Sequence, residues 1–112
     1  MKTSVPLYQA KAELFRTLGH PVRIRVLELL QDGPRAVRDL IAELEIEPSN
    51  LSQQLAVLRR AGLVTSAREG TSVNYTLATP AVVDLLVAGR GILASVLADA
   101  EGLLAELRST DA

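Results

Sequence analysis

The 112-residue sequence contains no cysteine and only one histidine, His20. Without cysteine, the chain cannot form a disulfide, a thiolate metal site or a cysteine nucleophile. The lone histidine has no evident serine and aspartate partners, and no glycine-rich phosphate loop follows a predicted strand. It lies in a Gly-His-Pro sequence between two predicted helices, where we expect it to cap or pack rather than to bind a ligand. The sequence therefore does not predict an enzyme.

Aromatic residues and uninterrupted hydrophobic runs are also scarce. Aromatics make up only 3% of the sequence, so the core must be built from Leu, Val, Ile and Ala, which favours packed helices. The apolar stretch 81–98 is interrupted by Asp84, Arg90 and two glycines, which argues against a membrane span. We therefore expect no membrane partner and, because no export signal is evident, a cytoplasmic protein.

The net charge of −1 provides no overall basic surface, which by itself argues against a nucleic-acid partner. The charges are unevenly distributed, however. From residue 79 onward the sequence has five acidic residues and only two basic ones. The acidity is concentrated in the C-terminal third and does not exclude a nucleic-acid surface elsewhere.

Hydrophobic residues make up 48% of the sequence, enough for a single domain over residues 1–112. In the first half, apolar residues recur at helical spacing, and glycine or proline separates successive segments. This pattern predicts four helices, at residues 5–18, 22–30, 37–44 and 49–61.

A β-hairpin is expected after the fourth helix. Residues 63–68 and 72–77 alternate weakly in hydropathy around a glycine-containing tip at residues 69–71. The third and fourth helices form a helix-turn-helix over residues 37–61, and the hairpin over residues 63–77 is its wing. The predicted fold is therefore mainly α-helical with a small β-hairpin: a winged helix-turn-helix of four helices, two strands and a fifth helix.

The fifth helix is predicted over residues 79–108. Its apolar residues recur at spacings of three and four over about seven turns, more apolar surface than a small domain covers on one helix. We predict a symmetric dimer through this helix, with the helix in residues 1–18 alongside. The alternative is that the stripe folds back on its own domain, as a helix that is shorter or bent at Gly89 or Gly91. The stripe comprises Val82, Leu85, Leu86, Ile92, Leu93, Val96, Leu97, Leu103, Leu104 and Leu107.

The fourth predicted helix turns a polar face outward. Its leucines share one side, which leaves the polar side chains of residues 49–54 and Arg59 on the other. In a helix that enters the DNA major groove, the amides of Gln53 and Gln54 suit adenine, and serine hydroxyls suit phosphates or bases. Arg59 and Arg60, late in the helix, suit phosphates. An ordinary solvated surface is the alternative.

The predicted wing and third helix add further candidates. Arg68 and the amides near Gly70 are placed to contact the flanking DNA backbone, and Arg38 on the third helix suits a phosphate. A hairpin with a purely structural role is the alternative. The candidates for DNA contact are Arg38, Ser49, Asn50, Ser52, Gln53, Gln54, Arg59, Arg68, Gly70, Thr71 and Asn74.

Taken together, these segments resemble the ArsR-type (ArsR/SmtB) family of bacterial winged-helix transcriptional regulators, many of which are metal sensors. The resemblance implies a homodimer that binds an inverted-repeat operator in double-stranded DNA, usually as a repressor released when an effector binds. It covers nearly the whole chain. Its most specific parts are residues 18–27 (LGHPVRIRVL), 51–64 (LSQQLAVLRRAGLV), 68–70 (REG) and 75–77 (YTL).

The chain departs from this family at several functional positions. The family's Cys-x-Cys metal site, which precedes Asp-Leu in the third helix, is replaced by Ala36 and Arg38 and cannot form. Gln54 stands where histidine is frequent, and Thr71 stands where a basic residue is common. A second family site uses His and carboxylates of the C-terminal helices, of which only the carboxylates Asp84, Asp99, Glu101 and Glu106 are present.

These departures leave the effector undefined. We expect no cofactor; a divalent metal held by His and carboxylates is the alternative, and carboxylates alone favour hard ions. A dimeric protein-interaction module is the rival to a DNA-binding repressor. In that alternative, a protein co-regulator would carry the missing sensor site.

Overall fold

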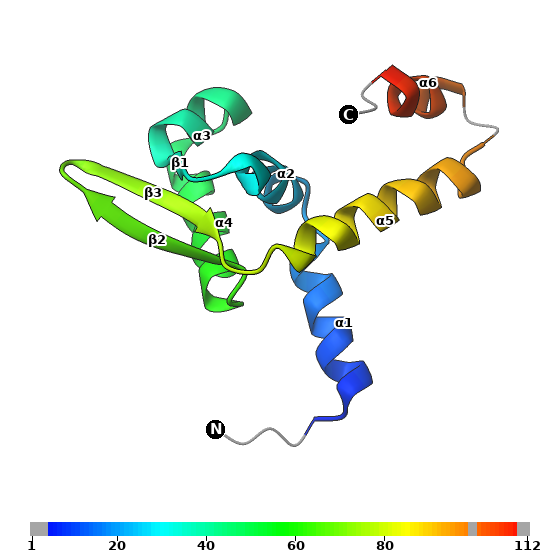
Figure 1. Cartoon of the computed structure of the whole chain (residues 1–112), viewed down its shortest axis with the longest axis horizontal. Coiled ribbons are helices and arrows are strands. Elements are labelled where there is room, and N and C mark those ends of the chain that lie inside the picture. The colour runs from blue at the N-terminus through cyan, green and yellow to red at the C-terminus, as the bar shows by residue number, and fades with distance from the viewer. Residues whose placement is uncertain (1–4, 99–100, 110–112) are drawn as a thin grey trace. The chain divides into compact units, whose positions relative to one another are not determined.

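The computed structural model describes residues 5–98 and 101–109, and the chain divides into two compact units, Met1–Pro80 and Ala81–Ala112 (Figure 1). Helices dominate both units, and the first also holds a small antiparallel sheet. This confirms the predicted fold class. The first unit contains α1 (Leu7–Leu18), α2 (Pro21–Leu29), the 3-10 turn η1 (Leu30–Asp32), β1 (Arg35–Ala36), α3 (Val37–Leu44), α4 (Pro48–Arg60), β2 (Val64–Glu69) and β3 (Ser72–Leu77); the second contains α5 (Ala81–Val96) and α6 (Glu101–Ser109).

The core of the first unit is aliphatic, as the scarcity of aromatics predicts. Buried leucines and valines from α2, α3, α4 and the start of β2 meet there and anchor α4 by three of its leucines. Truncating a fully buried leucine in such a core typically costs about 2–5 kcal/mol. The largest fully buried side chains are Leu27, Leu30, Leu40, Leu51, Leu55, Leu58, Val26 and Val64.

His20 caps α2, which confirms its predicted structural role. Its Nδ1 accepts a hydrogen bond from the backbone N–H of Val22 at 3.2 Å. Pro21 follows at the first helical position, where the missing N–H is not needed. The imidazole thus satisfies one of the N–H groups that a helix leaves without an internal partner.

Two tight turns set the direction of α4. Before it, Glu45 adopts a left-handed conformation (φ 54°), and Pro48 occupies the first helical position. After it, Gly62 has φ 80°, and the N–H of Leu63 donates to the carbonyl of Leu58 at 3.0 Å. This closing bond is that of a Schellman motif, in which glycine takes the left-handed position. Gly62 therefore ends α4.

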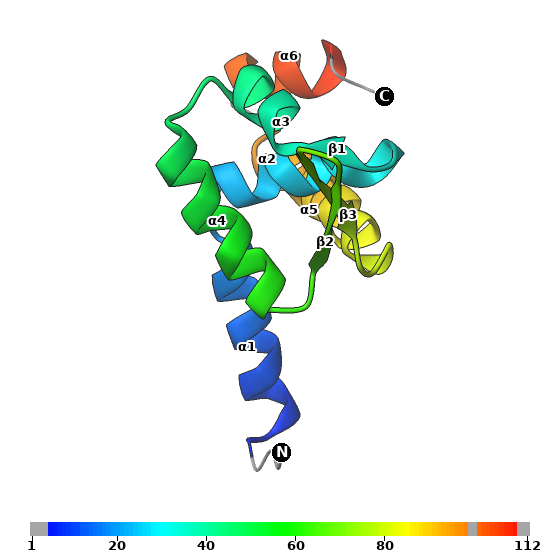
Figure 2. The same cartoon turned by 90° about the vertical axis from the view of Figure 1, so that its left-hand side faces the viewer.

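The wing is a two-stranded hairpin within a three-stranded sheet of order β1-β3-β2. Glu69 pairs with Ser72 at its end, so that Gly70 (φ 65°) and Thr71 form the turn. The strand β1 was not predicted, because two residues are too short to show a period. Its Arg35 pairs with Tyr75 of β3, which ties the wing to the start of α3. Figure 2 shows the hairpin beside α4.

The second unit contains two helices, so the prediction of one continuous helix over residues 79–108 is wrong. α5 runs through both Gly89 and Gly91 and ends at Val96. Helix propensity does not explain this end, because α5 continues through two glycines, which are weaker helix formers than Ser95 and Val96. Of the predicted stripe, the side chains of Leu103 and Leu104 lie outside the described residues.

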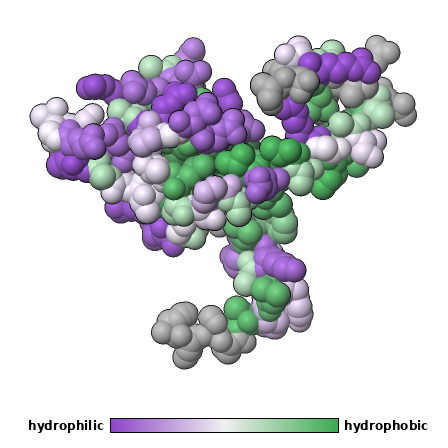
Figure 3. All heavy atoms as spheres, in the orientation of Figure 1, coloured by the Kyte–Doolittle hydropathy of each residue, from purple (hydrophilic) through white to green (hydrophobic). Residues whose placement is uncertain are grey.

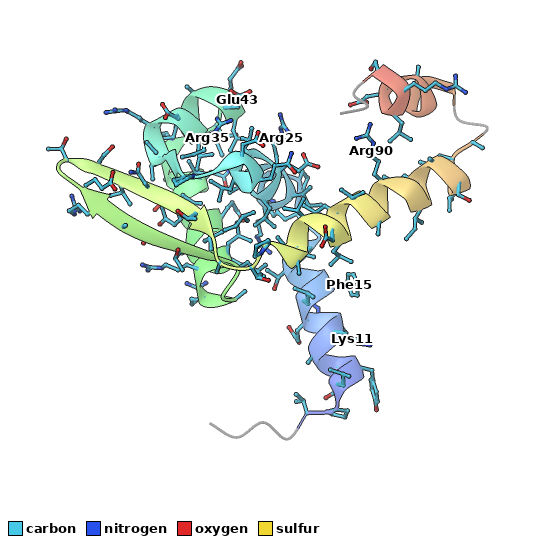
Figure 4. The ribbon with its side chains drawn as sticks, viewed as in Figure 1. Lys11, Phe15, Arg25, Arg35, Glu43 and Arg90 are labelled. Atoms are coloured by element: carbon cyan, nitrogen blue, oxygen red, sulfur yellow. The ribbon has the colours of Figure 1, made fainter. Side chains whose placement is uncertain are left out.

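α5 and α6 are joined by Arg90, whose Nη2 donates to the backbone carbonyl of Leu107 at 2.8 Å. Figure 4 shows Arg90 extending from α5 on the side of α6.

Among the described residues, no helix is both long enough and apolar enough to cross a membrane.

Each unit leaves apolar side chains exposed. On α1, Leu7, Tyr8 and Phe15 are exposed, and on α5 the exposed set is Val87, Ile92, Leu93 and Val96. Figure 3 shows hydrophobic atoms gathered on both helices, whereas hydrophilic atoms cover α3 and the wing. Ile92, Leu93 and Val96 are spaced by three and four residues and therefore share one face of α5.

Candidate nucleic-acid interface

The outward face of α4 carries a row of exposed polar side chains. Ser49, Gln53 and Arg60 are four and seven residues apart, so they follow one line along the helix. Ser52 and Arg59 are exposed beside this row. Hydroxyls and an amide thus occupy the first half of the helix, and guanidinium groups occupy its end. This order suits base edges near the N-terminus and phosphates near the C-terminus of a major-groove helix.

Gln54 does not belong to this row, so the prediction that its side chain faces outward is wrong, and the contact with adenine loses the geometry on which it was predicted. Its side chain is 8% exposed and buried between helices. Its Oε1 accepts a hydrogen bond from Arg23 Nε at 2.9 Å, and its Nε2 donates to Asn50 Oδ1 at 3.0 Å. A base could be bound only at the expense of these contacts. Asn50 is half-buried at the edge of the row.

Arg38 extends the polar surface onto α3. It is exposed, while its neighbour Leu40 is fully buried and holds α3 to the core. α3 follows β1 directly, and Arg35 of β1 pairs with Tyr75 of β3. This pairing positions α3 relative to the wing. The predicted phosphate contact of Arg38 is therefore sterically open.

The end of the wing presents Arg68, Gly70 and Thr71, all exposed. Asn74 is half-buried, and its Nδ2 donates to Glu69 Oε1 at 3.0 Å across the hairpin. The amide group of Asn74 thus holds the only carboxylate of the wing in place. Its predicted contact with DNA stays a prediction.

The charge balance differs between the two units. The sequence has ten basic and eight acidic residues up to Pro80, and two basic and five acidic residues after it. The first unit therefore carries a surplus of positive charge, and its exposed guanidinium groups include those of Arg38, Arg59, Arg60 and Arg68. An anionic polymer would be attracted to this unit.

The structure shows no metal site formed by those of the four candidate carboxylates that it describes. Asp84 and Glu106 are exposed, whereas Asp99 and the side chain of Glu101 lie outside the described residues. Within residues 5–98 and 101–109, no group of three or more metal-ligating side chains is close enough to hold an ion.

Arg60, which the sequence predicts to suit a phosphate, is exposed on the row of α4. One arginine with a place in the site was not predicted from the sequence. Arg23 lies on α2 and contacts α4 from inside the unit. No sequence pattern links Arg23 to Gln54, which is 31 positions away.

Residues 20–66 match the family model described as "Bacterial regulatory protein, arsR family". The chain is also 50% identical over 107 residues to the HTH-type transcriptional regulator Rv0081 of Mycobacterium tuberculosis, covering 95% of this chain and 94% of that protein. The crystal structure of Rv0081 superposes with a TM-score of 0.76 at 52% identity, covering 86% and 97% of the two chains.

Two further solved structures are similar. The transcriptional repressor BigR of Xylella fastidiosa gives a TM-score of 0.69 at 32% identity, covering 80% of this chain and 87% of BigR. The homodimeric winged helix-turn-helix DNA-binding domain of Mb0332 from Mycobacterium bovis gives a TM-score of 0.64 at 31% identity, covering 83% and 82% of the two chains.

Proposed function

Because this chain belongs to the ArsR family of bacterial regulatory proteins, we propose that it is a homodimeric repressor that binds an inverted-repeat operator through α4 and the wing. Regulators of this family bind DNA, act as homodimers and are not enzymes. The observation that carries the proposal is the exposed row of Ser49, Gln53 and Arg60 on a helix anchored by buried leucines. The comparisons support this function over the alternative of a protein-interaction module.

In the proposed complex, α4 of each copy enters the major groove of one half-site. Ser49 and Gln53 face base edges, Arg59 and Arg60 face phosphates, and the wing end at Arg68 contacts the flanking backbone. A two-fold symmetric dimer requires half-sites about one helical turn apart, roughly 10–10.5 base pairs between centres, or a multiple of that spacing. The site of action of such a repressor is the cytoplasm.

Exposed apolar side chains support the dimer. Ile92, Leu93 and Val96 form an apolar face on α5 that a second copy can cover. The homodimeric state of the similar Mb0332 domain agrees with this arrangement. Repression is supported by the similarity to BigR, which is described as a transcriptional repressor.

Substituting Gln53 and Arg59 tests the two kinds of contact. Gln53→Ala is expected to weaken binding to the operator by ~1–3 kcal/mol in each half-site and to leave random DNA unaffected, because an amide that binds a base edge carries sequence information. Arg59→Ala is expected to weaken both DNAs alike, because phosphates are common to all sequences. Fluorescence anisotropy with operator and random duplexes measures both effects.

Gln31→Ala is the matched control for Gln53→Ala, because Gln31 is an exposed glutamine in η1, outside the proposed interface. It should bind both duplexes as the unmodified protein does. A Gln53→Ala variant that loses the same affinity for operator and random DNA would contradict base recognition by this residue.

A further inference from the structure

A chain of three hydrogen bonds runs from the end of α1 to the start of α4. Arg23 Nη1 donates to the carbonyl of Thr17 at 2.9 Å, and Arg23 Nε donates to Gln54 Oε1 at 2.9 Å. Gln54 Nε2 then donates to Asn50 Oδ1 at 3.0 Å. The chain therefore connects α1, α2 and α4 inside the first unit.

The chemistry of arginine fixes the direction of every bond in this chain. A guanidinium group has only donors, so the atom of Gln54 that faces Arg23 must be its carbonyl oxygen. The amide nitrogen of Gln54 must then face Asn50. Because that nitrogen can only donate, the atom of Asn50 that accepts its hydrogen bond must be Oδ1. Arg23 thus determines the orientation of both amides.

The side-chain amide nitrogen of Asn50, Nδ2, reaches solvent. Nδ2 takes part in no hydrogen bond among the described residues, and no buried side-chain nitrogen or oxygen of those residues lacks a partner. Since Asn50 is only half-buried, its NH₂ group must reach the surface. It does so in the first turn of α4, two residues after Pro48.

We propose that Arg23 is a positioning residue that acts through Gln54 to hold Asn50 as a hydrogen-bond donor toward DNA. The ligand of Asn50 is then an acceptor atom of the operator, either a purine N7 or O6, a thymine O4 or a phosphate oxygen. This inference rests on the proposed function of α4 in DNA binding. It assigns roles to Arg23 and Gln54, neither of which touches the DNA.

A double-mutant cycle tests whether Arg23 acts through Asn50. Arg23→Met should weaken operator binding by the dimer roughly five- to 160-fold, the effect of losing one ordinary hydrogen bond in each copy. In an Asn50→Ala background the same substitution should change the affinity by less than about twofold, because the group that Arg23 positions is gone. Equal losses in both backgrounds would overturn the proposal, because a merely structural arginine acts independently of Asn50.

Two further variants separate positioning from charge. Arg25→Met removes the same charge from α2, but Arg25 is exposed and pairs with Glu28 at 3.1 Å, so operator binding should be unchanged. Arg23→Lys keeps a donor for Gln54 and should retain more affinity than Arg23→Met. Binding to random duplexes identifies the acceptor: a loss confined to the operator indicates a base, and an equal loss on both DNAs indicates a phosphate.

A measurement on the free protein distinguishes failure of this inference from failure of the proposed function. Hydrogen exchange of the Gln54 side-chain amide, followed by NMR, should accelerate in Arg23→Met. Unchanged exchange would overturn the positioning of Asn50 by Arg23 through Gln54. If the unmodified protein binds DNA normally but the affinity losses of Arg23→Met and Asn50→Ala are additive, this positioning role alone would be overturned. An unmodified protein that binds no DNA would overturn the proposed function and the DNA-facing role of Asn50 with it.

Discussion

The affinity of the dimer for DNA is expected to fall by roughly 10³- to 10⁵-fold between about 50 and 200 mM salt. The reason is the number of exposed arginines on the proposed face. Arg38, Arg59, Arg60 and Arg68 provide four guanidinium groups in each copy, and hence eight in a dimer. If each neutralises one phosphate, the slope of log affinity against log salt concentration is roughly −7. Titrations at several salt concentrations measure this slope.

Substitutions on and off the face sharpen this prediction. Arg59→Ala removes two phosphate contacts from a dimer and should make the slope shallower by about 2. Lys11→Ala removes a basic group that projects from α1 (Figure 4), outside the proposed face, and should leave the slope unchanged. A slope near zero for the unmodified protein would rule out phosphate contacts as a main source of its DNA affinity.

Val96→Asp is expected to weaken dimerisation by more than about 100-fold, because an uncompensated buried carboxylate costs roughly 3–5 kcal/mol. Val96 is 70% exposed in the single chain and lies on the apolar face of α5 with Ile92 and Leu93. In a two-fold symmetric interface the substitution occurs on both sides, so that two like charges are introduced together. Sedimentation equilibrium measures the dissociation constant, and operator affinity should fall in parallel.

Val87→Asp is the matched control for this substitution. Val87 is the same residue type, is 63% exposed and lies on the same helix. The two valines are separated by about two and a half helical turns and therefore face opposite sides of α5. Val87→Asp should remain dimeric. Equal effects of the two substitutions, or a monomeric unmodified protein, would show that the face of Ile92, Leu93 and Val96 does not mediate dimerisation.

Local sequence patterns predicted most of the winged helix-turn-helix. The bounds of α3 were predicted without error, and those of α4 within one residue, because leucine periodicity, Pro48 and Gly62 specify them locally. Two features were not predictable in this way. β1 is too short to carry a pattern, and α5 ends at Val96 although the apolar spacing continues beyond it.

The inward position of Gln54 shows why a helical pattern does not settle a site. Its position on the helical wheel is at the border between the leucine face and the polar row. It is buried because Arg23, far away in the sequence, supplies a hydrogen-bond donor inside the unit. Without a partner, a buried amide would be unfavourable, and the side chain would be expected at the surface. Tertiary contacts, not periodicity, decide such border positions.

Selection of bound sequences from a pool of random DNA duplexes tests the central claim most directly, since it requires both base recognition and a symmetric dimer. The selected sequences should converge on an inverted repeat whose half-site centres lie about 10–10.5 base pairs apart, or a multiple of that spacing. The same selection with Gln53→Ala should yield an inverted repeat with the same spacing but with a weaker base preference in each half-site. Enrichment of no sequence, or of a single half-site without a symmetric partner, would contradict a homodimer that recognises its operator through α4.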